Sequence, residues 1–360
     1  MCGRTCCTLS PDLLPYACST IANSNGSTIL PKWNNPADEI NDCERNEKGK
    51  KYRNYSPSTN IAPTAFTPVL LSMPSNLQKF DYGNKNQETY KIDANIVLDT
   101  MMWGLIPPWH RSDTPKGHGL TTNNARIETI KESKLYKPSL ENNQRCVVIC
   151  DGFYEWKTFK DNSKQPYIIY AKQNCLMCKA KSECRNSLPS HTCQIQTQSV
   201  EDLSKHWKDG DGWSGQKPLF MAGIYSKWYP TLSSVYDTKL KCPVNSYTII
   251  TRESGNIMKW IHHRMPLFLF NTDDVTLWLD PKVSSFDAID ILSKRQDEEK
   301  LSWHPVSPSV GAIKNQADDL ILKVELNSDG KAVNKSTKKS ANIMLNWLKP
   351  VVKPGNAKGI

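Results

Sequence analysis

RCVVICDGFYEWK, residues 145–157, says more about the fold than any other stretch of this 360-residue chain. Its first half is a short apolar run rich in β-branched residues, and Asp151 and Gly152 follow it. A run of this kind, bounded by a turn signal, predicts a buried strand that ends in a turn. Just past the predicted strand, the stretch places a carboxylate, Glu155, between two aromatic residues.

Elements on both sides of this stretch indicate the fold class. The last apolar runs before the tail predict two helices, one from Thr272 to Pro281 and one from Ser285 to Gln296, with Ser285 at the cap and basic residues in the last turns. Strands outnumber helices and do not alternate regularly with them, which favours an α+β fold with mixed or antiparallel β-sheets. Further strands are predicted at 165–171, 219–228, 245–254 and 265–270.

The chain is expected to form one domain, over residues 1–326. Its length is ample for a hydrophobic core. Residues 173–217 lack apolar periodicity and are interpreted as a surface insertion between two strands. Residues 327–360 are interpreted as a short basic tail, because they hold seven lysines and no acidic residue beyond Asp329.

Composition narrows the class of protein. The formal net charge of +10 favours polyanionic partners. No run of 18 apolar residues predicts a membrane span, and no apolar segment at the N-terminus predicts secretion. Without a secretory signal, the 12 cysteines are expected to be reduced thiols in the cytosol or nucleus.

The second residue, Cys2, has a chemical possibility that no internal cysteine shares. Removal of Met1 would leave an α-amine and a thiol on adjacent carbons. Such a terminus can attack an acyl carbon with the amine as base. Alternatively, the amine condenses with an aldehyde and the thiol closes on the imine to give a thiazolidine. A cysteine near a terminus can also be there by chance.

Four other segments could carry chemistry, although each also has an ordinary structural interpretation. Burial of Glu155 would raise its pKa and suit it to proton transfer, whereas a surface position would not. Residues 260–266 offer histidines for proton transfer and Arg264 for phosphate binding, or form a basic loop. Residues 121–129 are predicted to be a loop. The fourth segment has four thiols and one histidine that could hold zinc, but their spacing does not match a zinc template, so no metal site is predicted there. These residues are Cys175, Cys178, Cys184, Cys193 and His191.

Eight segments, taken together and in order, resemble the SRAP (SOS response-associated peptidase) family, above all its eukaryotic members. The resemblance covers residues 1 to about 325 and implies a single SRAP-type domain. The insertion with its cysteines is not part of the family signature. The matching segments are MCGR (1–4), YSPSTNIAP (55–63), WGLIPPW (103–109), NNARIET (123–129), RCVVICDGFYEWK (145–157), MAGIYSKW (221–228), SYTIIT (246–251) and IHHRMP (261–266).

The resemblance implies a covalent reaction with abasic sites in single-stranded DNA. After loss of Met1 by self-processing or an aminopeptidase, Cys2 would form a thiazolidine crosslink with the abasic aldehyde, shield the strand from breakage and later release it. Asn124 would orient Cys2, Glu155 would position the amine and move protons, and His262 would help the sugar ring to open and the crosslink to reverse. The implied DNA-binding residues are Arg4, Asn60, Arg126, Trp156 and Arg264, with Trp103 and Trp109 walling the same groove.

Two other functions stay open: an N-terminal-nucleophile amidohydrolase or peptidase, and a noncatalytic reader of single-stranded or modified-base DNA. No cofactor, metal or membrane is expected in any of them. The chain is expected to be a monomer in the nucleus, at chromatin or replication forks, with the cytoplasm as a second compartment. Contact with replication-fork proteins is open, because the chain lacks the glutamine-led box of sliding-clamp ligands.

Overall fold

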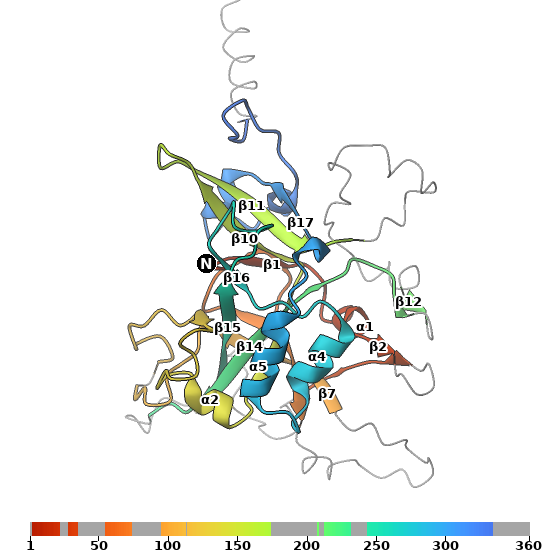
Figure 1. The fold of residues 1–360 in the computed structure, drawn as a ribbon, viewed down its shortest axis with the longest axis vertical. Coiled ribbons are helices and arrows are strands. Elements are labelled where there is room, and N and C mark those ends of the chain that lie inside the picture. Colours follow the sequence, from red (N-terminus) through yellow and green to blue (C-terminus); the bar gives the residue numbers. More distant parts are fainter. Residues whose placement is uncertain are drawn as a thin grey trace, which may run out of the picture.

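The computed structural model describes residues 2–21, 28–34, 55–73, 95–112, 114–173, 207–208, 212–231 and 243–333. These residues form an α+β fold, as predicted, with two main sheets, one antiparallel and one mixed, and four short α-helices. Figure 1 shows the antiparallel sheet above the mixed sheet, with helices in front of the mixed sheet.

The smaller main sheet has five strands, all antiparallel. The strand predicted at 165–171 is confirmed and is the second strand in this sheet. In spatial order the strands are β17 (Leu301–Pro305), β11 (Lys164–Ala171), β10 (Gly152–Thr158), β1 (Thr5–Cys7) and β5 (Ser58–Ile61).

The larger sheet has eight strands and is mixed. Strand β7 pairs with both β6 and β15, so the five strands β15, β14, β9, β6 and β7 close on themselves. Strand β8 adds to β15 in parallel. The strands are β16 (Arg264–Pro266), β15 (Val244–Glu253), β14 (Leu219–Trp228), β9 (Arg145–Cys150), β6 (Phe66–Met73), β7 (Asn95–Trp103), β4 (Lys32–Trp33) and β8 (Asn124–Arg126).

The remaining elements are short. Two strand pairs, β2 (Thr20–Ile21) with β3 (Thr28–Ile29) and β12 (Trp207–Lys208) with β13 (Gly212–Trp213), lie outside the main sheets. The α-helices are α1 (Leu14–Ala17), α2 (Lys137–Glu141), α4 (Thr272–Leu279) and α5 (Ser285–Lys294). The 3-10 turns are η5 (Glu298–Lys300), η6 (Pro308–Gly311) and η7 (Asp318–Ile321).

The stretch 145–157 joins the two sheets. Every residue of β9 is buried, because one face lies inside the closed sheet and α4 packs on the other; the Trp278 indole donates to the Cys146 carbonyl at 2.9 Å. The predicted turn after β9 is wrong. Only Asp151 separates β9 from β10, and the chain there passes from one sheet into the other.

Both predicted helices are confirmed as α4 and α5, but the cap of α5 is Ser284 and not the predicted Ser285, which is the first residue of the helix. The Asn271 side chain accepts a hydrogen bond from the Asp274 N–H, and the Ser284 side chain accepts one from the Asp287 N–H. These caps satisfy N–H groups that the first turn of a helix leaves unpaired. The strand predicted at 265–270 is confirmed only over β16, with a further isolated bridge between Phe268 and Met221.

The C-terminal end of the described chain packs onto the β10–β11 hairpin. Leu326 and Ala332 form a bridge, and the Ala332 N–H donates to the Gln165 side-chain oxygen at 2.7 Å. Contacts therefore continue past residue 326. Most of the predicted insertion, including its cysteines, lies outside the described residues. No helix among the described residues is long and apolar enough to cross a membrane.

Candidate active site around Cys2

Cys2 lies just ahead of β1, the strand between β10 and β5. Its carbonyl oxygen accepts hydrogen bonds from the side-chain amides of Asn124 at 2.7 Å and Asn123 at 3.2 Å. Asn124 begins β8, which pairs in parallel with β15 opposite Ile249. Residues 123–126, predicted as a loop, are thus held on the mixed sheet, and they bind the N-terminal segment.

The Cys2 thiol and the Glu155 carboxyl share a buried environment. Burial raises the pKa of the Cys2 thiol, and the negative charge of Glu155 raises it further. Burial also raises the pKa of Glu155. Glu155 reaches this position because β10 pairs with β1: the Tyr154 N–H donates to the Arg4 carbonyl at 2.8 Å. Both groups therefore hold their protons more tightly than usual.

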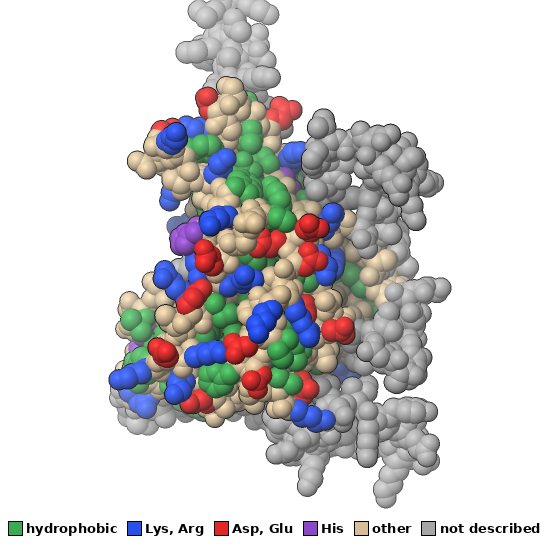
Figure 2. All heavy atoms as spheres, viewed as in Figure 1, with side chains coloured by type: hydrophobic (Ala, Val, Ile, Leu, Met, Phe, Trp, Pro, Cys, Tyr) green, Lys and Arg blue, Asp and Glu red, His purple; other side chains and the backbone are tan. Residues whose placement is uncertain are grey.

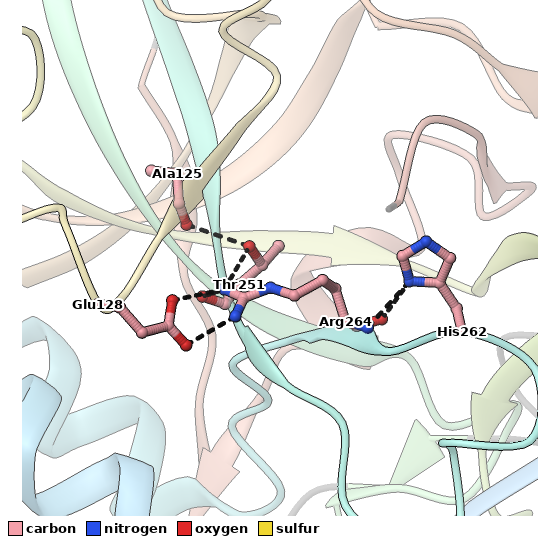
Figure 3. A network of polar contacts seen from close by, with 5 residues as sticks. All are labelled: Ala125, Glu128, Thr251, His262 and Arg264. Atoms are coloured by element: carbon pink, nitrogen blue, oxygen red, sulfur yellow. Dashed lines mark hydrogen bonds and ion pairs between the residues drawn. The ribbon is translucent and has the colours of Figure 1, made fainter.

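His262 precedes β16, and its ring is held by the main chain of Arg264 (Figure 3). Nδ1 lies 2.9 Å from the Arg264 backbone nitrogen and 3.1 Å from the Arg264 carbonyl oxygen, so the main chain fixes the orientation of the ring. Burial lowers the pKa of His262 to about 4, and the charges of His263 and Arg264 act in the same direction. His262 is therefore neutral at pH 7. Its ring stacks on that of His263 at 4.4 Å between centroids.

The Arg264 guanidinium is bound inside the protein (Figure 3). It makes a bidentate pair with Glu128, at 2.6 and 2.9 Å, and donates to the Thr251 carbonyl at 2.7 Å. The side chain of Arg264 is 9% exposed, whereas that of Glu128 is 48% exposed. The phosphate contact implied for Arg264 stays a prediction, and it would require the pair with Glu128 to open.

Arg4 and Asn60 form a buried network with the segment after β17. Arg4 donates to the Asn60 side-chain oxygen at 2.8 Å and to the Val310 carbonyl at 2.9 Å. The Asn60 amide donates to the carbonyls of Ala312 at 3.0 Å and Asn315 at 2.8 Å. Both side chains fasten residues 310–315 to β1 and β5, so their implied DNA contacts stay predictions beside this structural role.

The remaining implied residues differ in exposure. Arg126 is exposed at the end of β8, and Trp156 is half-buried against the small cluster around Tyr154. Trp109 is 52% exposed, but Trp103 is fully buried. The Trp103 indole donates to the Asn123 carbonyl at 3.0 Å, so it supports the residue that binds Cys2. The prediction that Trp103 walls a groove is therefore corrected.

Two residues of this site were not singled out from the sequence: Asn123, which binds Cys2, and Glu128, which binds Arg264. Both belong to the segment NNARIET, so the signal was present, but a polar run does not show which side chains turn inward. No group of three or more metal-ligating side chains occurs among the described residues. Cys2, Cys6, Cys7, Cys18, Cys146 and Cys150 are free and buried.

The fold and the site together define an α+β protein whose candidate chemistry is gathered at the second residue of its chain. On the face drawn in Figure 2, histidine side chains reach the surface at the level of the N-terminus, among acidic and basic side chains. The family model "SOS response associated peptidase (SRAP)" matches residues 1–313. The chain belongs to this family.

Curated relatives match most of the chain. The chain is 33% identical over 350 residues to a protein of Xenopus tropicalis named "Abasic site processing protein HMCES", covering 97% of this chain and 85% of the relative. It is 27% identical over 267 residues to "Abasic site processing protein YoaM" of Bacillus subtilis, covering 74% and 85%. A crystal structure of a Bordetella bronchiseptica protein is similar with a TM-score of 0.49 and 14% identity, covering 85% of this chain and all of that one.

Proposed function

We propose that this protein processes abasic sites in single-stranded DNA by bonding to them covalently through Cys2 after removal of Met1. The observation that carries the proposal is the position of Cys2, which two asparagine amides hold by its carbonyl beside the Glu155 carboxyl. The names of the relatives support the same substrate. An abasic deoxyribose opens to an aldehyde, which is the electrophile that a 1,2-aminothiol captures.

The proposed reaction has two bond-forming steps. The α-amine of Cys2 adds to the aldehyde carbon, and the carbinolamine loses water to give an imine. The Cys2 sulfur then adds to the imine carbon, its proton passes to the nitrogen, and the thiazolidine ring closes. Ring closure removes the imine, which would otherwise promote β-elimination and strand breakage; reopening of the ring and hydrolysis of the imine reverse the crosslink.

The buried carboxyl of Glu155 is suited to the proton transfers of these steps. With its pKa raised, it takes a proton from the attacking amine and returns one to the departing hydroxyl more readily than an ordinary glutamate. In the proposed tautomer, His262 accepts the Arg264 N–H at Nδ1 and carries its proton on Nε2, from which it would donate a hydrogen bond to the sugar oxygen. Full proton donation by His262 requires nearby phosphates to raise its lowered pKa.

The amidohydrolase alternative starts from a different nucleophile. Attack on an amide by Cys2 needs the thiolate, and the raised pKa of this thiol opposes its formation. The crosslinking route begins instead with the amine and uses the thiol second. The proposal includes four further expectations. They are self-removal of Met1, a monomeric state, a nuclear location and contact with replication-fork proteins.

The test is a denaturing gel of Met1-processed protein with single-stranded DNA carrying one abasic site, followed by mass spectrometry. A heat-stable adduct at Cys2 is expected, and an aldehyde-blocking reagent should prevent it. Cys2→Ser should give an imine that borohydride traps but no stable adduct, and Cys2→Ala should give neither. The absence of any adduct from protein with a free α-amine would contradict the proposal; unchanged DNA retention by Cys2→Ala would favour a noncatalytic reader.

A further inference from the structure

The face of the five-stranded sheet that carries Glu155 continues into an aromatic surface. Glu155 pairs with Tyr167 on β11, and Ile169, two residues further along β11, pairs with Trp303 on β17. Directly paired residues and alternate residues along a strand share a face. Tyr167, Trp303 and Lys157 therefore lie on the same face as Glu155, and Figure 1 shows their three strands side by side.

Trp260 covers this face two residues before His262. Its ring centroid is 4.9 Å from that of Tyr167, nearly perpendicular, and 5.9 Å from that of Trp303. The Lys157 Nζ lies 5.4 Å from the Trp260 ring centroid. Tyr167 is buried, but Trp260 remains 36% exposed. In the aromatic surface, the buried Tyr167 ring therefore supports the Trp260 ring, which is open to solvent.

The loop that presents Trp260 is fixed from below. The Glu298 carboxylate accepts hydrogen bonds from the N–H groups of Ile257 at 3.1 Å and Met258 at 3.2 Å. The Ile261 N–H donates to the Met258 carbonyl at 3.1 Å. Because the same loop leads directly into His262, the position of the Trp260 ring relative to the candidate site is set by the fold.

Charge decides what this surface can take. An exposed indole with an ammonium beside it suits a ligand that has both a flat π-system and negative charge, and Lys259 adds a second exposed cation next to Trp260. Single-stranded nucleic acid combines these features: its bases stack on aromatic rings while lysines hold its phosphates.

We infer that Trp260, supported by Tyr167 and Trp303, is a stacking subsite for a nucleobase beside the abasic residue, and that Lys157 and Lys259 hold the neighbouring phosphate. The inference rests on the proposed function and deepens it. The abasic residue itself has no base to stack, so affinity for the strand must come from its neighbours. This subsite supplies that affinity within two residues of His262.

The experiment measures the affinity of the full-length, Met1-processed protein for short single-stranded oligonucleotides with a central tetrahydrofuran residue, which has no aldehyde. One oligonucleotide has bases on both sides of this residue, and the other has tetrahydrofuran there too. Stacking on an aromatic side chain is worth about 1–3 kcal/mol per base. Trp260→Ala should therefore weaken binding of the first oligonucleotide at least about fivefold and leave the second nearly unchanged.

Two variants control this measurement. Trp260→Phe keeps a flat ring and should retain most of the affinity. Tyr229→Ala removes another exposed aromatic, 62% exposed with the Lys227 Nζ 5.7 Å from its ring, at the end of β14 in the other sheet. It should change neither affinity, and thermal unfolding of each variant shows whether the fold is intact.

The subsite is overturned if Trp260→Ala weakens binding of both oligonucleotides equally or of neither. It is also overturned if Tyr229→Ala weakens binding as much as Trp260→Ala does. Crosslinking to a natural abasic site, measured in parallel, separates this outcome from the proposed function. If Cys2 never crosslinks but the effect of Trp260 depends on the neighbouring bases, the proposed function fails and the stacking subsite stands. If Cys2 crosslinks and Trp260→Ala binds both oligonucleotides like the wild type, the proposed function stands and the stacking subsite fails.

Discussion

Glu155 is the side chain on which the proposed chemistry depends most, because it is the buried carboxyl beside Cys2. Glu155→Gln keeps the shape and removes the titrating group, so we expect imine formation to slow by about 10²–10⁴-fold, the usual contribution of general acid–base catalysis. The wild-type rate should rise with pH through the raised pKa of Glu155, as the carboxylate base forms, and the variant should lack this limb. Borohydride trapping of the imine measures both.

His262→Gln provides the comparison for this prediction. Its effect should be largest with abasic DNA whose sugar must still open, and small with a substrate that already presents a free aldehyde. Loss of imine formation in the His262 variant, with imine formation kept in the Glu155 variant, would overturn the division of roles between them.

Glu128 tests what Arg264 does. Burial raises the pKa of Glu128, but the hydrogen bond and charge of Arg264 outweigh it and lower that pKa overall. The carboxylate is therefore ionised near neutral pH and competes with any phosphate for Arg264. Glu128→Gln should raise the affinity for tetrahydrofuran-containing single-stranded DNA, by roughly tenfold for one charge-assisted hydrogen bond. The measurement is a binding isotherm at fixed salt, and unchanged affinity would restrict Arg264 to positioning His262.

For single residues, the sequence predicts which side chains could act in the candidate site but not which side chains they contact. Cys2, Asn124 and Glu155 were candidates, and the structure brings them together. Glu128 is not a candidate from the sequence, because nothing in a polar segment shows that its partner is Arg264, at the start of β16 and more than a hundred residues away.

Among the elements, the junction between β9 and β10 differs most from its prediction. The apolar run correctly predicts β9, but the Asp-Gly pair after it predicts a turn at Asp151 that the structure does not have. Its carboxylate instead accepts hydrogen bonds from the Thr8 N–H at 2.6 Å and the Thr8 hydroxyl at 2.7 Å. Thr8 follows β1, more than 140 residues before Asp151 in the sequence. No local sequence pattern therefore shows that the chain passes from one sheet to the other at Asp151.

Asp151 should make stability depend on pH. Burial raises the pKa of Asp151 to about 6, so the folded state holds this proton more tightly than the unfolded chain, whose aspartates titrate near ~3.9. The contribution of Asp151 is therefore largest below pH ~4 and is lost as pH rises to about 6, by up to about 3 kcal/mol. Asp151→Asn should lack this dependence.

Urea unfolding of the wild type and Asp151→Asn at several pH values measures this difference, since subtraction removes the other titrating groups. Thr8→Val removes the hydroxyl donor that lowers the pKa of Asp151, so it should move the window to higher pH. A difference between the wild type and Asp151→Asn that stays constant from pH 4 to 7 would contradict the assignment.

Over the whole molecule, pairing between distant segments determines the shape. The closed sheet depends on the pairing of β7 with β15, in which Met102 lies opposite Ser246. Periodicity along the chain indicates strands and helices but not which strands meet, so the sequence predicted the α+β class and not the closure. Acidic and basic side chains mix on the face drawn in Figure 2, so on that face the net charge of the chain does not mark a binding surface.

The segment 334–360 gives the last prediction, which concerns the charge of the whole chain. It holds six lysines and no acidic residue, a large part of the net charge of +10. Near the end of the described chain, the Val333 N–H donates to the Glu325 carbonyl at 3.0 Å. Because the segment is expected to act through its lysines, its deletion should leave the thermal unfolding midpoint unchanged and weaken binding to single-stranded DNA. The salt slope of log K should fall by about 0.7 for each phosphate that the shortened protein no longer neutralises. A full-length variant with the six lysines changed to glutamine should match the deletion; a lower midpoint in the deletion alone would show that the segment belongs to the folded domain.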